Sequence, residues 1–298
     1  MLTHWICFEH FNSSSRPKKF NPHTSILNPQ GSKLPKIYVK VVGICQFFSI
    51  FACEMANTLT IDRGNTSTKI AVWASRDAES PLLLHSFLTP SARDIANCIK
   101  GMSVASAIVS SVAGDIPGLR EALEADGVSL LKLVGDTPLP LTMNYETPET
   151  LGTDRIAALV GARSLLSSRN VLVVDIGTAV TYDFLNSDGT FVGGNIAPGI
   201  GMRLEALHAF TSRLPEVSSH GRNGLWGTTT ETAMRNGAIN GVVAEISYYR
   251  SQLPEGSVTM LTGGRCEDIA ERLPFENNVD KLLVLRGLNS ILHYNEDL

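Results

Sequence analysis

Apolar and polar residues follow one another in short blocks from residue 55 onward, each block long enough for one strand or one helix. Runs rich in Val, Ile and Leu, which are typical of strands, lie at 58–62, 69–74, 104–109, 129–134, 171–175, 179–184, 258–262 and 281–285. Helical periods lie between them, at 116–126, 154–166, 200–210, 229–252, 265–273 and 287–295. Strands that alternate with helices in this way predict an α/β fold.

The first 54 residues lack this pattern. Residues 1–40 show neither a strand period nor a helix period, and residues 41–53 form an apolar run that is shorter than the ~20 residues of a membrane span. Met55 follows at once, and the first predicted strand begins at residue 58. We therefore expect translation to begin at Met55 and residues 1–54 to be a disordered or wrongly assigned leader. Secretion, membrane attachment and a genuine appended segment are the alternatives.

Composition narrows the class of protein. The chain has 298 residues, 43% of them hydrophobic, which suits about two domains. Its 25 Lys and Arg stand against 29 Asp and Glu, and six of the basic residues lie in the first 54. An acidic body argues against nucleic acid as a partner. The five cysteines form no C-x-x-C pair, so we expect no zinc site, no structural disulfide and a cytoplasmic location.

Two stretches form an internal repeat, "TLTIDRGNTSTKIAVW" (58–73) and "VLVVDIGTAVTYDF" (171–184). Each has an apolar strand, then Asp-x-Gly, polar residues and a second strand, with Thr68 and Thr181 at the same distance from their aspartates. Two copies predict two similar lobes, 55–168 and 169–298, facing a central cleft. The alternative is that Asp-x-Gly is here an ordinary hairpin turn.

Such hairpins suit a phosphate bound through a cation. Gly64 and Gly177 let the backbone approach a ligand, while Asn65, Thr66 and Thr178 add side-chain donors. A carboxylate repels phosphate but binds Mg²⁺, which in turn binds phosphate oxygens. The pair of hairpins therefore predicts a metal–phosphate clamp, and neither a P-loop motif nor the protein-kinase signature set occurs.

A third motif, "YETPETLGTDRIAALVGA" (145–162), begins a predicted helix at Gly152–Arg155. Asp154 could accept a proton from a substrate hydroxyl, with Arg155 offering a fork to an anionic substrate. The alternative is that Thr153 or Asp154 only caps the helix. Together with the clamp, the motif supplies the parts that phosphoryl transfer requires.

The chain resembles the type III pantothenate kinases, of the acetate/sugar kinase–Hsp70–actin superfamily. Seven motifs occur in that family's order over residues 56–298: DRGNTSTK (62–69), YETPETLGTDR (145–155), DIGTAVTYDF (175–184), GGNIAPGIGMRLEAL (193–207), GTTTETAMRNG (227–237), TGG (262–264) and LVLRGLN (283–289). The resemblance implies two lobes of the actin-like ATPase (ribonuclease H-like) type. It also implies phosphorylation of pantothenate by ATP to 4′-phosphopantothenate, the first step towards coenzyme A.

The resemblance further implies roles for individual residues. ATP would contact Asp62, Arg63, Gly64, Asn65, Thr66, Ser67, Thr68, Lys69 and Thr178, with Asp62 near Mg²⁺. Asp175 would bind the monovalent cation (K⁺ or NH₄⁺) that this family requires. Pantothenate would contact Tyr145, Gly152, Thr153, Asp154, Arg155 and Thr230, with Asp154 as general base and Thr230 reaching across a homodimer interface.

Two departures and two alternatives remain. Arg63 replaces an apolar residue, and strand alternation should point it away from the phosphates. Arg265 stands where the family has a small or acidic residue, which leaves the contacts to the nucleotide base open. A sugar or acetate kinase on the same plan is one alternative; a regulatory binder that kept the fold without catalysis is the other. No membrane partner is expected.

Overall fold

The computed structural model describes residues 56–298, and the expectations for residues 1–54 lie outside this range. The first sheet contains β1 (Asn57–Arg63), β2 (Thr68–Trp73), β3 (Leu83–Phe87), β4 (Val104–Ser111) and β5 (Ser129–Lys132). The second contains β6 (Thr142–Met143), β7 (Val171–Ile176), β8 (Ala179–Leu185), β9 (Thr190–Pro198), β10 (Val258–Thr262) and β11 (Asn278–Val279). The predicted α/β fold is confirmed.

The two sheets share one topology. The first has the strand order β3-β2-β1-β4-β5, and the second has β9-β8-β7-β10-β11 with β6 added beside β9. In each, the first two neighbouring pairs along the chain are antiparallel, whereas β1–β4 and β7–β10 are parallel. The repeat predicted from two aspartate hairpins is therefore a repeat of whole sheets, as in the actin-like fold.

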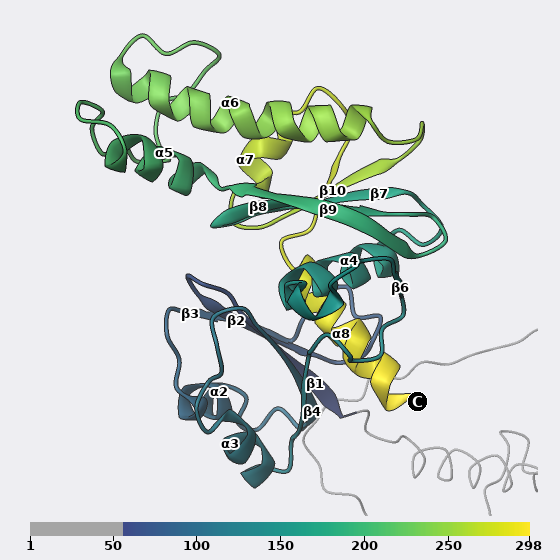
Figure 1. Ribbon diagram of the computed structural model, residues 1–298. Coiled ribbons are helices and arrows are strands. Elements are labelled where there is room, and N and C mark those ends of the chain that lie inside the picture. The colour runs from purple at the N-terminus through teal and green to yellow at the C-terminus, as the bar shows by residue number, and fades with distance from the viewer. Residues whose placement is uncertain (1–55) are drawn as a thin grey trace, which may run out of the picture. The chain divides into compact units, whose positions relative to one another are not determined.

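Helices separate and cover the sheets, as Figure 1 shows. α2 (Ala92–Cys98) and α3 (Leu119–Ala125) pack on one face of the first sheet. α5 (Ile200–Ala209), α6 (Thr230–Ser251) and α7 (Cys266–Ala270) pack on one face of the second. α4 (Thr153–Leu165), which follows the 3₁₀ turn Pro148–Thr150, and α8 (Leu283–Glu296) lie between the two sheets.

α4 and α8 touch through their backbones. A Cβ atom on Gly161 would overlap the carbonyl of Leu283, and one on Gly287 would overlap the carbonyl of Ala157. Residues without side chains at this crossing let the two helices approach closely and fill the space between the sheets. α8 packs on β1 and β4 as well, whereas β6, from before residue 168, pairs with β9. The lobe boundary near residue 168 stays a prediction.

One predicted element is wrong. The apolar run 281–285 is not a strand but leads into the first turn of α8. α8 is buried on nearly every side in its first half, so its apolar residues form a run instead of a one-sided stripe. The sequence patterns also missed β3, β9 and α2. β9 contains Gly193, Gly194 and Pro198, which usually indicate loops.

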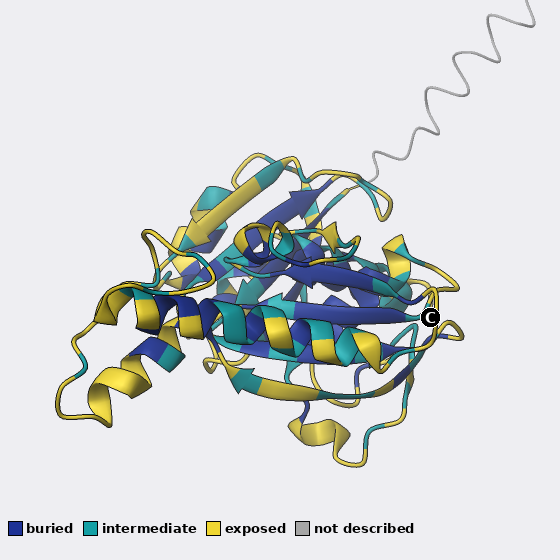
Figure 2. Ribbon diagram, turned by 90° about the horizontal axis from the view of Figure 1, so that it is seen from above, coloured by how far each residue is buried: buried dark blue, intermediate teal, exposed yellow. Residues whose placement is uncertain are grey.

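Burial is concentrated in the strands and in α4 and α8, while exposed residues gather on the connecting loops and on the outer sides of α5 and α6 (Figure 2). Within residues 56–298, no helix is both long enough and apolar enough to cross a bilayer.

Candidate functional site

A cleft of about 500 Å³ lies between the two aspartate hairpins. Nine of the predicted site residues line it: Asp62, Gly64, Asn65, Thr66, Ser67, Lys69, Asp154, Asp175 and Thr178. The three acidic residues thus share one cavity although they come from β1, α4 and β7. This is the arrangement that the phosphate clamp requires.

The first hairpin turns through four residues, Gly64–Ser67, and the Gly64 N–H donates to the Ser67 carbonyl at 3.0 Å. Asp62 at the end of β1 lies opposite Lys69 at the start of β2 in the antiparallel register. A carboxylate and an ammonium group therefore face each other across the hairpin, at the wall of the cleft.

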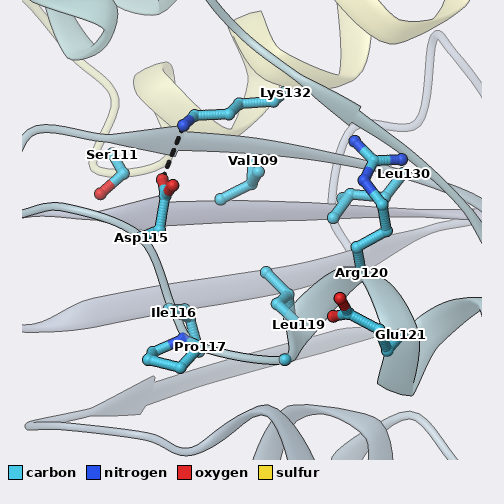
Figure 3. A pocket seen from close by; sticks show the side chains of 11 residues that line it. Val109, Ser111, Asp115, Ile116, Pro117, Leu119, Arg120, Glu121, Leu130 and Lys132 are labelled. Atoms are coloured by element: carbon cyan, nitrogen blue, oxygen red, sulfur yellow. Dashed lines mark ion pairs between the residues drawn. The ribbon is translucent and has the colours of Figure 1, made fainter.

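Arg63 and Thr68 do not line the cleft. Thr68 is buried, and the Arg63 guanidinium donates from Nη1 to the carbonyl of Asp115 at 2.6 Å. Strand alternation therefore turns Arg63 away from the cleft, as expected. Asp115 lines a separate cavity of about 330 Å³ beside α3. Its Oδ1 forms an ion pair with Nζ of Lys132 at 2.7 Å (Figure 3). The hydrogen bond to Asp115 therefore holds the Arg63 side chain on the side of β1 that faces away from the cleft.

The second hairpin is shorter. Its turn is Gly177–Thr178, closed by the Gly177 N–H donating to Ala179 at 3.0 Å, and Asp175 lies opposite Thr181. Gly263, at φ +92°, packs against this hairpin so closely that a Cβ atom there would overlap the Asp175 carboxylate. The TGG motif is therefore part of the wall behind Asp175.

The tips of the hairpins meet. The hydroxyls of Thr66 and Thr178 lie 3.1 Å apart, within hydrogen-bonding distance. Residues 112 positions apart in the sequence thus come into contact at the rim of the cleft.

The cleft shifts the ionisation of its acids. Burial raises the pKa of Asp62 to about 7, an effect that Lys69 opposes and that the charges of Asp154 and Asp175 reinforce. Burial also raises the pKa of Asp175 to about 6, again with a contribution from Asp154. Carboxylates gathered in this way repel one another when ionised, so a cation in the cleft would stabilise their charged forms.

Asp154 lies in the first turn of α4. Its Oδ1 accepts the N–H of Arg155 at 2.8 Å and lies where a Cβ atom on Gly152 would come within 2.5 Å of it. The N-cap of α4 is Gly152, and no side chain caps the helix, so the alternative that Thr153 or Asp154 caps it is wrong. The Asp154 carboxylate still interacts with the positive end of the helix, and it lines the cleft at the same time.

Arg155 points away from the cleft into a buried ion pair. Its Nε donates to both oxygens of Asp183 at 3.1 Å, and its Nη2 donates to Oδ1; the side chains are only 6% and 1% exposed. The guanidinium also lies 5.9 Å from the ring centres of Tyr145 and Phe191, which stack on each other. The two nitrogens held by Asp183 cannot form a fork to a substrate carboxylate at the same time.

The other predicted acceptor residues lie beside the cleft or away from it. Thr153 and Ser110 share a hydrogen bond between their hydroxyls at 2.8 Å. Thr230 is exposed at the first turn of α6 and does not line the cleft. Within one chain, the structure therefore brings Asp154, but not Thr230, to the cleft between the two hairpins.

Several lining residues were not predicted to have a role. They include Thr181, His220, Gly263, Arg265 and Lys281. Arg265 donates to the side chain of Asp268 and to Ser219, so it links two segments of the cleft wall. The motifs TGG and DIGTAVTYDF contained Gly263, Thr181 and Asp183, but residues brought together from distant strands give no local signal.

Comparison with known proteins agrees with this geometry. A family model described as type III pantothenate kinase matches residues 58–252. A type III pantothenate kinase from Azobacteroides pseudotrichonymphae is 38% identical over 242 residues, covering 80% of this chain and 97% of the relative. The corresponding enzyme of Bacteroides fragilis is 40% identical, covering 80% of this chain and 98% of its own. The chain belongs to the type III pantothenate kinase family. As a member, it is a kinase.

Solved structures support the fold alone. A Campylobacter jejuni protein assigned to the Baf family of transcriptional activators matches with a TM-score of 0.54 at 21% identity, covering 80% of this chain and all of its own. A Sinorhizobium meliloti protein assigned as a 2-dehydro-3-deoxygalactonokinase matches with a TM-score of 0.53 at 15% identity, covering 81% and 100%. Both have the two-sheet architecture described above.

Proposed function

We propose that this protein transfers the γ-phosphoryl group of ATP to the hydroxyl of pantothenate, giving 4′-phosphopantothenate in the first step of coenzyme A biosynthesis. The observation that carries the proposal is the convergence of Asp62, Asp154 and Asp175 on one cleft, in a chain of the type III pantothenate kinase family. A regulatory binder on this fold would have no need of three acids at one site.

The first hairpin is the proposed phosphate end. Its turn, Gly64–Ser67, supplies backbone N–H groups and hydroxyls, and Lys69 supplies a positive charge. Thr178 approaches from the other side of the same rim. Their shared position in the cleft supports their assignment as ATP contacts. Arg63 and Thr68 belong to this assignment only as scaffold of the hairpin.

The acids fit a divalent cation that is held jointly with the nucleotide. Within residues 56–298, no group of three or more His, Cys, Asp or Glu side chains could hold a metal ion by itself. Mg²⁺ in kinases commonly takes one or two carboxylates and completes its shell with phosphate oxygens and water, which agrees with one carboxylate at Asp62. When bound, the ion would neutralise charge on the phosphates. Asp175 is the proposed ligand of a monovalent cation.

Asp154 is the proposed general base. It lies in the cleft, next to the phosphate end, and its carboxylate is held at the start of a helix. A carboxylate in this position can accept the proton of a substrate hydroxyl as the hydroxyl attacks phosphorus. Gly152, Thr153 and Tyr145 lie around the same turn and are the proposed acceptor end, whereas Arg155, buried in its ion pair with Asp183, supports the turn without facing the cleft.

We also propose a homodimer, in which Thr230 of one chain completes the acceptor end of the other. Gly237 lies two helical turns after Thr230 on the same face of α6; it is exposed, and a Cβ atom there would meet nothing within 4 Å. Packing within the chain therefore gives no reason for glycine at this position, whereas a Cβ on Gly241 would contact Arg203. A neighbouring helix is the simplest reason for Gly237. A cytoplasmic location belongs to the same proposal.

A coupled ATP assay tests the function. We expect ADP formation that depends on pantothenate and is stimulated by K⁺, both in the full chain and in a chain that begins at Met55. A panel containing acetate and hexoses tests the alternative kinases. Turnover of a sugar or of acetate, without turnover of pantothenate, would contradict the proposal.

Asp154→Asn tests the base. Removal of the proton acceptor should lower kcat by about 10²- to 10⁴-fold, while the affinity for ATP changes little. Glu149→Gln, in the 3₁₀ turn before α4, is the matched control and should leave kcat near wild type. An Asp154→Asn enzyme with wild-type turnover would remove Asp154 from this role.

A further inference from the structure

The first turn of α4 is tied to both sheets, one residue on either side of Asp154. Thr153 shares a hydrogen bond with Ser110 of β4 in the first sheet, at 2.8 Å. Arg155 forms its buried ion pair with Asp183 of β8 in the second sheet. Asp154 stands between these two ties and lines the cleft. The direction of Asp154 is therefore fixed by contacts of its two neighbours with both sheets.

The residues around the Arg155 guanidinium pack closely against it and against Asp183. Gly194 lies opposite Asp183 on β9, and a Cβ atom there would overlap Oδ1 of Asp183. Phe191 is fully buried on the same strand and stacks on Tyr145, with 5.6 Å between the ring centres. The Arg155 guanidinium lies 5.9 Å from the centre of each ring. Two strands, β8 and β9, and the segment that follows β6 thus contribute to holding a single arginine.

Stability alone does not account for this charged pair. The surrounding cluster is apolar, with Val173 and Leu185 among its members. Replacement of a buried ion pair by apolar residues of similar size is often neutral or stabilising, because desolvation offsets much of the Coulomb attraction. What an ion pair with three hydrogen bonds adds over an apolar contact is a defined orientation of the groups that it joins.

We propose that Asp183 is a positioning residue for this kinase: it holds the Arg155 guanidinium in one orientation and thereby fixes the turn from which Asp154 faces the acceptor hydroxyl. The inference rests on the proposed function. It assigns to Asp183 no contact with either substrate. Asp183 acts on the acceptor end of the cleft and has no contact with the first hairpin, where the phosphates are proposed to bind; its charge contributes only weakly to the raised pKa of Asp175 in the second hairpin.

The test is the kinetic separation of the two substrates in Asp183→Asn, which keeps the shape of the side chain and removes its charge. We expect kcat/KM for pantothenate to fall by about 10- to 100-fold, since a misplacement of about 1 Å can cost this much. The KM for ATP should stay within about twofold. A merely structural role would change both substrates alike.

Asp280→Asn is the matched control. The Asp280–Arg286 pair is the other ion pair in residues 56–298 in which both side chains are less than a fifth exposed, at 15% and 17%. Its loss should lower the melting temperature while leaving both KM values within about twofold. If Asp280→Asn shows the same selective loss for pantothenate, or if Asp183→Asn leaves kcat/KM for pantothenate unchanged, the proposal is overturned.

A second variant covers the case in which Asp183→Asn does not fold. Phe191→Leu keeps an apolar side chain and the ion pair but removes the ring beside Arg155. It should lower kcat with pantothenate by about two- to fivefold and leave the KM for ATP unchanged; an unchanged kcat, or a KM for ATP that rises to the same extent, would overturn the proposal. A wild-type chain that does not phosphorylate pantothenate would instead overturn the proposed function.

Discussion

Asp62 and Asp175 stand at equivalent places, near the carboxyl ends of the corresponding strands β1 and β7, yet different residues face them across their hairpins. Asp62 lies opposite Lys69, and Asp175 lies opposite Thr181. The first turn has four residues between its strands and the second has two. Thr68 and Thr181, which match in the sequence, are therefore not equivalent in the structure: Thr181 occupies the place of Lys69.

This difference separates the two hairpins by charge. A carboxylate opposite an ammonium group, beside a long turn rich in donors, suits a polyphosphate together with its cation. A carboxylate opposite a hydroxyl, with Gly263 packed behind it, presents mainly negative charge and suits a cation alone. The same hairpin unit used twice can thus suit two kinds of ligand through a difference in a single cross-strand pair and in turn length.

The largest expected effect comes from breaking the pair that distinguishes the hairpins. Lys69→Met should lower kcat/KM for ATP by about 10²- to 10³-fold, because a preorganised positive charge at the transferring phosphate is removed. Thr181→Val, at the equivalent place in the second hairpin, should cost less than about fivefold. Steady-state kinetics with ATP as the varied substrate measures both, and equal losses would show that the hairpins do not differ in this way.

The glycines give the next effect. Gly263→Ala should lower the free energy of unfolding by about 2–4 kcal/mol, because φ is +92° and the new Cβ would overlap the second hairpin. Gly64→Ala, in the first hairpin, should cost less than ~1 kcal/mol, because the nearest atom to its Cβ is the Ser67 carbonyl at 3.5 Å. Denaturant unfolding of the ligand-free variants compares them. A smaller cost at Gly263 than at Gly64 would contradict the packing described.

Titration should separate the two aspartates. In the folded protein the pKa of each lies above its usual value of 3.8, at about 7 for Asp62 and about 6 for Asp175. The stability that these groups contribute is therefore fully present below about pH 4 and is lost as the pH rises through 6 and 7. We expect the ligand-free protein to melt a few degrees lower at pH 8 than at pH 5 on their account.

The aspartate variants assign this dependence. Asp62→Asn should raise the melting temperature at pH 8 and flatten its decline up to about pH 7, whereas Asp175→Asn should flatten the decline only up to about pH 6. Melting curves at half-unit steps of pH, without nucleotide or divalent cation, distinguish the two. A melting temperature of Asp62→Asn that falls below wild type at pH 8 would contradict the assigned shift.

The smallest effect concerns the contact between the tips. Thr66 and Thr178 are exposed, so their hydrogen bond should contribute no more than about 1 kcal/mol. Thr66→Val, Thr178→Val and the double variant form a cycle whose coupling energy measures the contact. A single change that lowers ATP affinity far more than the coupling energy would indicate a separate contact of that threonine with the nucleotide.

Much of the fold was predictable because strands β1, β2, β4, β7, β8 and β10 are apolar runs bounded by turn signals. Strands β3 and β9 were not. In β3 polar and apolar residues are mixed, and Leu84 is 53% exposed. β9 contains glycines, and one of them, Gly194, leaves space for a side chain of the neighbouring strand β8. Gly194 looks like a loop residue until Asp183 and Arg155 are seen to fill the space beside it.

The site residues likewise fall into those that could be predicted from local sequence and those that could not. Residues of the hairpin turns could be predicted locally, since Asp-x-Gly, hydroxyls and a lysine lie within eight positions of one another. Arg155 was predicted as a fork for an anion, but its partner Asp183 lies 28 positions away and on another element. The partner of a charged side chain depends on tertiary contacts, and the spacing of residues within its own motif does not predict those contacts.

The long-range position of α8 has a consequence for biosynthesis. Asn289 accepts from Thr58 of β1, 231 positions earlier, and Arg286 donates to the carbonyls of Ala78 and Glu79. Until α8 emerges from the ribosome, α8 cannot pack on the apolar side of the first sheet, so residues such as Trp73 and Ile108 stay partly exposed. The sheet that is synthesised first is therefore covered last, and a stop codon before α8 would leave a nascent chain exposed to aggregation and proteolysis.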